Sequence, residues 1–203
     1  MVVKFTNFVF RTQIYPGHAN VCCLDDMAEV ALASGHFDYA KVNEGRPRML
    51  VLKQFLTTVI IFTSGKMRLM GSVICSEDAA RKFFKRYVIK TLMKNQHRRR
   101  LFIGDVHLQT KSATFDCEQH IDLNAFHQFI NKLPTPHDVE KAMPSSCNFY
   151  SAELFPALSL KIWGGDVHMN IFASGKCVMN GLRDNDQCYI IANQIVEYLN
   201  VYK

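Results

Sequence analysis

A short segment of this chain occurs twice, and that repeat limits the possible folds more than any other feature of the sequence. Residues 61–66 read Ile-Phe-Thr-Ser-Gly-Lys, and residues 171–176 read Ile-Phe-Ala-Ser-Gly-Lys. Each copy is followed five residues later by another glycine, Gly71 or Gly181. The copies lie 110 residues apart in a chain of 203 residues. A repeat with this period predicts two halves of related structure.

Each copy has the pattern of a β-hairpin followed by a helix. Val59–Phe62 consists of β-branched and aromatic residues, which favour strands. Ser64-Gly65 predicts a two-residue turn, and the return strand is expected from Lys66 to Val73. Ser76 then offers an N-cap to a helix whose apolar residues continue to Leu92 at helical spacing.

A strand and a helix are also expected before each hairpin. They are Phe5–Gln13 and Leu24–Ala33 in the first half, and Leu101–Gln109 and Ile121–Leu133 in the second. The helix after the second hairpin begins at Asp184 or Asn185. This order predicts an α+β fold with helices on one side of an antiparallel sheet. The other face of the sheet is then uncovered, and large apolar residues there suggest a binding surface.

The expected organisation is two repeats joined by a basic segment. The first repeat covers residues 1–95, the basic linker 96–100, and the second repeat 101–203 with an insertion near 134–148. The formal net charge is +6, but Lys66–Arg100 alone holds eleven basic residues and only two acidic ones. Such a block is either a polyanion-binding face or a solvated helix face, and charge alone leaves both alternatives open.

The sequence predicts neither an enzyme, a cofactor, a metal site nor a membrane protein. The seven cysteines include no Cys-x-x-Cys pair and fit no zinc spacing, which favours reduced thiols inside a cell. Asp105 and His107 form only a lone carboxylate–histidine pair on a strand, and no phosphate-binding loop motif is present. The N-terminus lacks the apolar region of a signal peptide, and no apolar stretch is long enough to span a bilayer.

Three runs of residues resemble the TATA-binding protein family. Residues 153–158 read E-L-F-P-A-L, close to the family's E-L-F-P-G-L, and residues 57–67 resemble its T-T-A-L-I-F-S-S-G-K-M. The second hairpin repeats the I-F-x-S-G-K pattern at residues 171–176. The resemblance covers nearly the whole chain. It implies two pseudo-symmetric repeats that form a saddle, with a curved antiparallel sheet and helices on the convex side.

The resemblance implies that phenylalanines on the open face push between base steps of DNA and kink it. Family position and spacing assign this intercalating role to Phe62, Phe155 and Phe172. The fourth position falls near Met49, because Pro47-Arg48-Met49 resembles the family's P-K-R-F. Methionine can still wedge, although its flexible side chain is a softer insert. Ile61 and Phe62 point to opposite faces of a strand, so Phe62 is not expected in the core.

The resemblance also implies residues that contact the floor and the walls of the minor groove. The expected groove-face residues are Asn7, Val9, Ile60, Asp105, Asn170, Val178 and Asn180. Asp105 stands where the family has an asparagine, and a carboxylate offers only acceptors to a groove lined with acceptors. Arg11, Arg68 and His107 also occupy face positions that are usually apolar or small. The expected phosphate contacts are Lys53, Lys66, Lys161, Lys176 and Arg183.

The implied function is that of a general transcription initiation factor that binds and bends A/T-rich double-stranded promoter DNA as a monomer. Implied partners are a TFIIB-like factor at Glu153, a TFIIA-like factor at the basic helix with Lys82, Lys85 and Arg86, and RNA polymerase. The nucleus is the expected compartment. The segment Pro134–Ser146 looks like an insertion, and the K-L-P-T-P run at its start resembles divergent relatives in large DNA viruses. A viral origin would place the protein in a viral factory in the host cytoplasm. The alternative is a protein-binding adaptor of the same fold with weak or no DNA binding.

Overall fold

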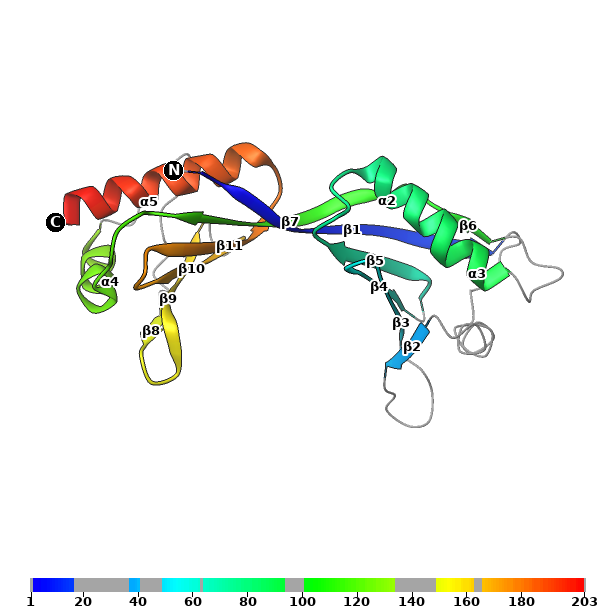
Figure 1. Ribbon diagram of the computed structural model, residues 1–203, viewed down its shortest axis with the longest axis horizontal. Helices are drawn as coiled ribbons and strands as arrows, with labels where there is room; N and C mark the ends of the chain where they lie inside the picture. Colours follow the sequence, from blue (N-terminus) through cyan, green and yellow to red (C-terminus); the bar gives the residue numbers. More distant parts are fainter. Residues whose placement is uncertain are drawn as a thin grey trace. The chain divides into compact units, whose positions relative to one another are not determined.

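The structure, a computed structural model, divides into two compact units (Figure 1). It describes residues 2–16, 37–40, 49–62, 64–93, 101–133, 149–162 and 166–202. The first unit is Asn7–Gln109, and the second unit combines Met1–Thr6 with Thr110–Lys203. The helix expected at Leu24–Ala33, the basic linker 96–100 and the insertion near 134–148 lie outside the described residues.

Each unit is completed by a segment from the other half of the sequence. β6 (Leu101–Ile103) follows the linker in sequence, yet it pairs with the end of β1 (Lys4–Pro16) in the first unit. The second unit takes in Met1–Thr6, where Val3 and Phe5 pack against its core. There the Lys111 Nζ atom lies 5.5 Å from the centre of the Phe5 ring. The compact units therefore differ at their ends from the two halves of the sequence.

The first unit is an antiparallel sheet with helices on one face. Its strands lie in the order β2 (Phe37–Ala40), β3 (Met49–Gln54), β4 (Thr57–Phe62), β5 (Lys66–Gly71) and β1. Side chains alternate between the two faces, so the core takes one residue in two from each strand. Leu50, Leu52, Val59, Ile61, Met67 and Leu69 are buried in this way. The strand predictions for Phe5–Gln13 and Val59–Phe62 are confirmed.

The predicted long helix of the first unit is present, with one irregular turn. It consists of α2 (Glu77–Phe83), the π-helical segment η1 (Phe84–Ile89) and α3 (Lys90–Met93), and it lies across the sheet (Figure 1). The Ser76 hydroxyl accepts a hydrogen bond from the Ala79 backbone amide at 3.2 Å, which confirms the predicted N-cap. The apolar helix residues complete the core of this unit.

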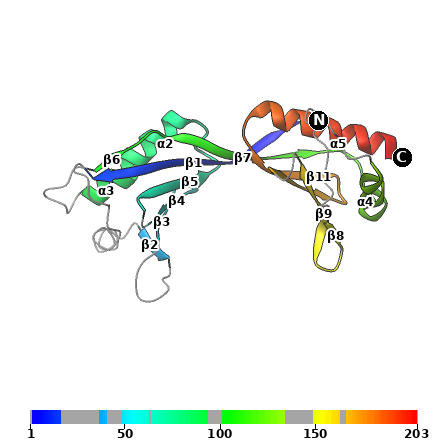
Figure 2. The same ribbon diagram turned by 180° about the vertical axis from the view of Figure 1, so that it is seen from behind.

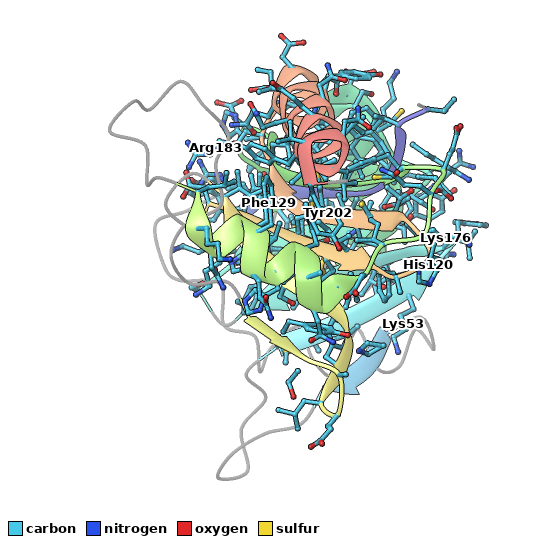
Figure 3. The ribbon with its side chains drawn as sticks, turned by 90° about the vertical axis from the view of Figure 1, so that its left-hand side faces the viewer. Lys53, His120, Phe129, Lys176, Arg183 and Tyr202 are labelled. Carbon is cyan, nitrogen blue, oxygen red and sulfur yellow. The ribbon has the colours of Figure 1, made fainter. Side chains whose placement is uncertain are left out.

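The second unit repeats this arrangement with two helices. Its strands lie in the order β7 (His107–Asp116), β11 (Lys176–Leu182), β10 (Val167–Phe172), β9 (Phe155–Ile162) and β8 (Phe149–Ser151). The helices are α4 (Leu123–Lys132) and α5 (Asn185–Tyr202), seen in Figure 2 beside the sheet. Figure 3 shows Phe129 and Tyr202 between the two helices, with ring centres 5.9 Å apart.

Side-chain caps fix where both helices of the second unit begin. The Asp122 carboxylate accepts hydrogen bonds from the backbone amides of Asn124 and Ala125, at 3.0 and 3.1 Å. The Asp184 carboxylate accepts from the Gln187 amide at 2.8 Å, so the cap of α5 is Asp184 rather than Asn185. The α+β class predicted from the sequence is confirmed.

Two predicted elements differ from the structure. The hairpin turns have three residues instead of two, because β10 ends at Phe172 and β11 begins at Lys176. The Gly175 amide donates to the Phe172 carbonyl at 2.9 Å with φ +88, and the Gly65 amide does so to Phe62 at 2.8 Å. A three-residue loop whose last residue has a positive φ is a common hairpin connection. A Ser-Gly pair fits both loop lengths, so the sequence alone does not distinguish them.

The strand predicted over Leu101–Gln109 is interrupted in its middle. β6 ends at Ile103, and β7 begins at His107 and continues to Asp116. At the break, the Gly104 amide donates to the Gln13 carbonyl at 2.9 Å, and the Gly104 carbonyl accepts from the Thr12 hydroxyl at 3.1 Å. Regular strand pairing therefore stops at Gly104. Its backbone amide and carbonyl are still hydrogen-bonded, to Gln13 and Thr12 of β1.

Neighbouring isoleucines of α5 provide a test of the packing. Ile191 is fully buried, whereas Ile190 is 47% exposed. We expect Ile191→Ala to lower the free energy of unfolding by about 2–5 kcal/mol, because it leaves a cavity in the core. Ile190→Ala, the matched control, should change it by less than about 1 kcal/mol. Chemical denaturation of both variants measures this difference, and equal losses would contradict the assigned face of α5.

Candidate nucleic-acid interface

The face of the first unit opposite its helices carries a continuous set of side chains from four strands. The register pairs Val51 with Ile60, Ile60 with Arg68, and Arg68 with Arg11, so these residues form one row across the sheet. Neighbouring rows include Met49 with Phe62, Lys66 with Gln13, and Met70 with Val9. We call this surface the first open face. Ile60 and Val9, two of the predicted groove-face residues, lie on it.

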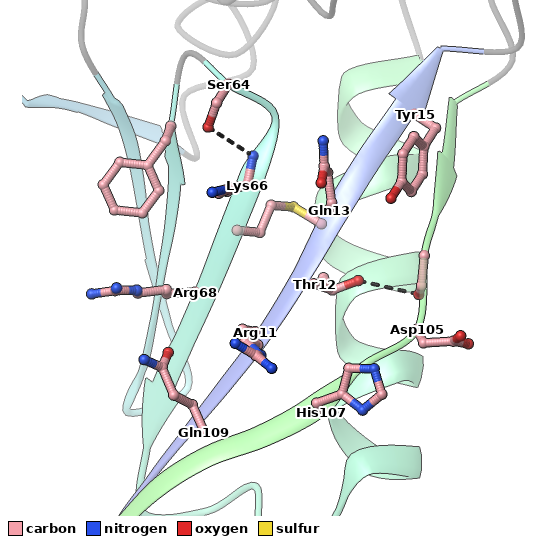
Figure 4. Close-up of a pocket in the computed structure, with 13 residues that line it drawn as sticks. Arg11, Thr12, Gln13, Tyr15, Ser64, Lys66, Arg68, Asp105, His107 and Gln109 are labelled. Carbon is pink, nitrogen blue, oxygen red and sulfur yellow. Dashed lines mark hydrogen bonds between the residues drawn. The ribbon is translucent and has the colours of Figure 1, made fainter. Parts of the chain in front are cut away.

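Phe62 is the aromatic residue of the first open face. It is half-buried, at the end of β4, and the Arg68 guanidinium carbon lies 5.8 Å from the centre of its ring. Such a stacked arrangement is a favourable cation–π contact. Phe62 also lines a depression with Ser64, Lys66 and Arg68 (Figure 4). The ring is therefore presented to the outside, as the alternation along the strand predicts.

Two arginines face each other in this depression. Arg11 and Arg68 are directly opposite on paired strands, and both side chains are exposed. Like charges at such positions destabilise a sheet by roughly 0.2–1 kcal/mol. Asp105 is the one carboxylate among the described residues that line the depression. The site is strongly electropositive and suits an anion.

Asp105 forms an ion pair with a residue of the helix. Its carboxylate oxygen lies 3.4 Å from the Arg81 guanidinium of α2, and 82% of its side chain is exposed. Figure 4 shows it at the edge of the depression, turned away from Arg11 and Arg68. We expected Asp105 on the groove face. The structure places it in the interruption between β6 and β7 of the first unit, where it lines the depression and pairs with Arg81 of α2.

The corresponding surface of the second unit, the second open face, carries two phenylalanines in contact. The rings of Phe155 and Phe172 are 6.2 Å apart and inclined by 61°, an edge-to-face arrangement. Phe155 is 41% exposed and Phe172 is half-buried. The structure thus brings these two predicted wedge residues together on a face that none of the described helices covers.

The two faces differ at the position of the fourth wedge. In the second unit Phe172 is opposite Ala157, and Phe155 lies two residues earlier on its strand. In the first unit Phe62 is opposite Met49, so Met49 corresponds in register to Ala157. The position that would match Phe155 lies before Met49, outside the described residues. Met49 remains a neighbour of Phe62 on the first open face.

The second open face also carries two asparagines, each hydrogen-bonded to a serine hydroxyl. The Asn170 side-chain oxygen accepts a hydrogen bond from the Ser159 hydroxyl at 2.8 Å. The Asn180 oxygen accepts from the Ser112 hydroxyl at the same distance. Because each oxygen is occupied, each side-chain amide presents its NH₂ group as a donor. Val178 lies between Asn170 and Thr114 in the same row.

Lysines border both open faces. Lys66 and Lys176 are exposed at the starts of β5 and β11, directly after the hairpin turns. Lys53 and Lys161 are exposed near the ends of β3 and β9. The remaining predicted phosphate contact, Arg183, has a partner already, because its guanidinium lies 3.0 Å from the Asp166 carboxylate.

The residues predicted to meet protein partners lie elsewhere. Glu153 is exposed in the turn between β8 and β9. Lys82 pairs with Asp78 one helical turn away at 2.7 Å, and this hydrogen bond lowers the pKa of Asp78 and raises the pKa of Lys82. Lys85 and Arg86 are exposed, and the Arg86 guanidinium carbon lies 5.4 Å from the centre of the Tyr87 ring.

Several residues of the open faces were not among the predicted site residues. Gln13, Tyr15 and Gln109 line the depression of the first open face. Ser112 and Ser159 orient the asparagines of the second. Alternation along each strand gives their side of the sheet, but only the pairing between strands shows which residues they meet.

Within the part of the chain that the structure describes, no three histidine, cysteine or acidic residues gather as metal ligands would. Four cysteines in that part, Cys75, Cys117, Cys177 and Cys188, are free thiols. None of its helices is sufficiently long and apolar to cross a membrane.

Known proteins share both this sequence pattern and this fold. The family model described as "Transcription factor TFIID (or TATA-binding protein, TBP)" matches residues 105–202. TATA box-binding protein-like 2 of Rattus norvegicus is 26% identical over 100% of this chain and 53% of its own length. The TATA-box-binding protein of Drosophila melanogaster is 27% identical over 91% of this chain and 46% of its own. This chain thus spans about half the length of these two relatives.

A shorter relative and a solved structure agree with this picture. The TATA-box-binding protein of Dictyostelium discoideum is 28% identical over 88% of this chain and 77% of its own length. The solved structure of Methanococcus jannaschii TBP has the same fold, with a TM-score of 0.65, complete coverage of both chains and 22% identity. The family model and these relatives show that the sequence resembles the TATA-binding protein family over most of its length, and the solved structure shows that the fold is the same.

Proposed function

We propose that this chain is a transcription initiation factor that binds A/T-rich double-stranded DNA in the minor groove and bends it. The observation that carries the proposal is the contact between Phe155 and Phe172 on an uncovered sheet face. Large apolar side chains that are held in place but exposed suit insertion between base steps, which unstacks them and kinks the duplex. The TATA-binding protein family is itself a standard example of this mechanism.

The polar residues around the phenylalanines support the same ligand. The amide NH₂ groups of Asn170 and Asn180 are donors, and A·T pairs display only acceptors in the minor groove. Exposed Lys66 and Lys176 lie at the turns beside Phe62 and Phe172, where they suit phosphate groups on either side of a groove. The faces thus combine wedges, groove donors and phosphate contacts.

The remaining roles are those that the resemblance to the family implies, and they belong to the same proposal. The rat and fly relatives are named for binding a TATA box. We propose that exposed Glu153 contacts a TFIIB-like factor and that Lys82, Lys85 and Arg86 contact a TFIIA-like factor or polymerase. The proposed compartment is the nucleus, or a viral factory if the protein is viral, and the proposed role involves no catalysis.

A protein-binding adaptor without DNA affinity is the second candidate. Asp105, Met49 and the polar residues of the first open face favour it, because the family has an asparagine, a phenylalanine and apolar or small residues at these positions. The two functions separate in one experiment, the binding of an A/T-rich duplex labelled at both ends over a salt series. Salt-sensitive binding with increased energy transfer between the ends supports the proposed function. A folded protein that binds no DNA at low salt supports the adaptor.

Removal of both phenylalanines of the second open face should reduce the bend. We expect Phe155→Ala with Phe172→Ala to weaken DNA binding by at least about tenfold and to lower the energy transfer in the bound duplex, because the wedge is lost. Thermal unfolding should show that the fold survives. Tyr189→Ala, which removes an exposed aromatic ring from α5, is the control. Unchanged bending in the double variant would remove the wedge assignment.

The lysines at the turns should set the salt dependence. We expect Lys66→Ala or Lys176→Ala to reduce the slope of log binding constant against log salt by about 1 each, because each neutralised phosphate releases counterions. Lys132→Ala at the end of α4 removes an equal charge outside the open faces and should leave the slope unchanged. Slopes equal to that of the unsubstituted chain in both turn variants would exclude phosphate contacts there.

Asp105 should oppose DNA binding only weakly. Its ion pair with Arg81 offsets part of its repulsion for phosphate, so we expect Asp105→Asn to tighten binding by less than about tenfold. Arg81→Ala should have the opposite effect, because it leaves the carboxylate without its partner. Titration of both variants with the same duplex measures these changes. Weaker binding of Asp105→Asn would mean that the carboxylate has a positive role in the complex.

A further inference from the structure

The second unit holds two thiols in contact with each other. The sulfur atoms of Cys117 and Cys177 are 3.8 Å apart, although the residues are 60 positions apart in the sequence. Cys177 is fully buried in the core of the unit, near the start of β11. Cys117 is half-buried and directly follows the end of β7. Solvent therefore reaches one of the two sulfur atoms, and the other is protected behind it.

The pairing of β7 with β11 brings these sulfur atoms together. Phe115 is opposite Cys177 in the register. The Cys117 amide donates to the Gly175 carbonyl at 3.0 Å, so the two chains stay paired for one residue past the end of β7. Cys117 lies two residues after Phe115 and is therefore on the same side of the chain, where it packs against the core. Side chains that are diagonal neighbours on one face of a sheet can reach each other.

Hydrogen bonds make the two thiols chemically different. The Cys177 thiol has two acceptors within reach, the Cys117 sulfur and the Gly175 carbonyl at 3.6 Å. The hydrogen bond between the thiols lowers the pKa of Cys117, whereas the same bond, together with burial, raises the pKa of Cys177. A thiol that is partly exposed and ionises readily is the kind that oxidants attack. Cys188 of α5 is the contrast, because burial raises its pKa to about 11.

We propose that Cys117 is a modification site for hydroperoxides and that Cys177 is the thiol that resolves the product into a disulfide. The Cys117 thiolate attacks one oxygen of hydrogen peroxide and the O–O bond breaks. Cys117 becomes a sulfenic acid, and the hydroxide that leaves takes up the thiol proton to form water. The inference does not depend on the proposed DNA binding, because it concerns residues that pack in the core of the second unit.

The second step consumes the sulfenic acid. The Cys177 sulfur attacks the Cys117 sulfur, the S–S bond forms and the S–O bond breaks. The departing hydroxide takes the Cys177 proton and leaves as a second water. Over both steps the two thiols lose two electrons and two protons, and one hydrogen peroxide is reduced to two waters.

The linkage needs a movement of the chain next to the second hairpin. A disulfide bond is about 2.05 Å long, so the sulfur atoms must approach by roughly 2 Å. Cys117 can make this approach because it lies beyond the end of β7. The linkage would join the chain after β7 to the start of β11, beside the turn between Phe172 and Lys176.

Trypsin separates the two cysteines, which makes the linkage measurable. Residues 112–132 and 177–183 are released as peptides with one cysteine each. The reduced chain is treated with hydrogen peroxide, its remaining thiols are alkylated, and the unreduced digest is analysed by mass spectrometry. We expect the two peptides to be linked and to separate again after treatment with a dithiol reductant. Cys117 should lose its thiol at least about tenfold faster than Cys188.

Variants test the separate roles of the two thiols. In Cys177→Ala the sulfenic acid of Cys117 has no resolving thiol, so we expect it to be captured by dimedone and otherwise to proceed to sulfinic acid. Cys117→Ser should slow the oxidation of Cys177 by at least about tenfold, because the reactive sulfur is missing. Cys75→Ser removes an exposed thiol from the first unit and, as the control, should form the linkage at an unchanged rate.

Trapping on the unsubstituted chain keeps the test valid if loss of the buried Cys177 impairs folding. Dimedone should then label residues 112–132 and not residues 177–183. A label on residues 177–183, conversion of Cys117 to sulfinic acid without linkage, or equal reactivity of Cys117 and Cys188 would each overturn the inference. Equal formation of the linkage in guanidinium-unfolded chain would overturn it as well, because the folded contact would then not be the cause.

Discussion

The alternation of side chains along paired strands is the constraint on which the rest of this structure depends. In each unit one side of the central strands supplies the core, and no helix or strand of the described residues covers the other side. A change of one residue in any strand pairing would move Phe62 or Phe172 into the core and bring Ile61 or Ile171 to the surface. Burial of the isoleucines therefore fixes where the phenylalanines and asparagines are displayed.

Most of the fold could be predicted from the sequence, because its signals are local and occur twice. Ser76 capped the expected helix, Pro134 follows the end of α4, and the strands around Phe62 and Phe172 alternate as expected. The errors concern backbone detail. A three-residue turn and a two-residue turn both end in glycine here, and the interruption at Gly104 depends on hydrogen bonds to Thr12 and Gln13 that come from a distant part of the chain.

The site was predicted less completely than the fold, for a related reason. Residue types and alternation correctly place Phe155, Phe172, Asn170 and Asn180 on one face of the sheet. Which side chains they contact depends on how the strands pair, and the sequence does not show that pairing. The turn between β3 and β4 has two residues, Phe55 and Leu56, whereas four residues separate the paired ends of β9 and β10. Met49 was expected as a wedge because residues 47–50 resemble a family motif, and such a resemblance does not give the pairing of the strands. The ion pair of Asp105 with Arg81 is likewise a tertiary contact without a local signal.

Because each unit contains a segment from the other half of the sequence, neither half is expected to fold completely by itself. A protein cut at the linker would give two fragments, each lacking a segment that its own unit contains. A fragment of residues 1–95 would lose β6 and leave the end of β1 unpaired, and exposed strand edges promote association with other chains. Two copies of a single half could pair these unpaired edges by exchanging their first strands, as domain-swapped dimers do. The present chain carries both halves, so each unit receives its end segment from the same molecule.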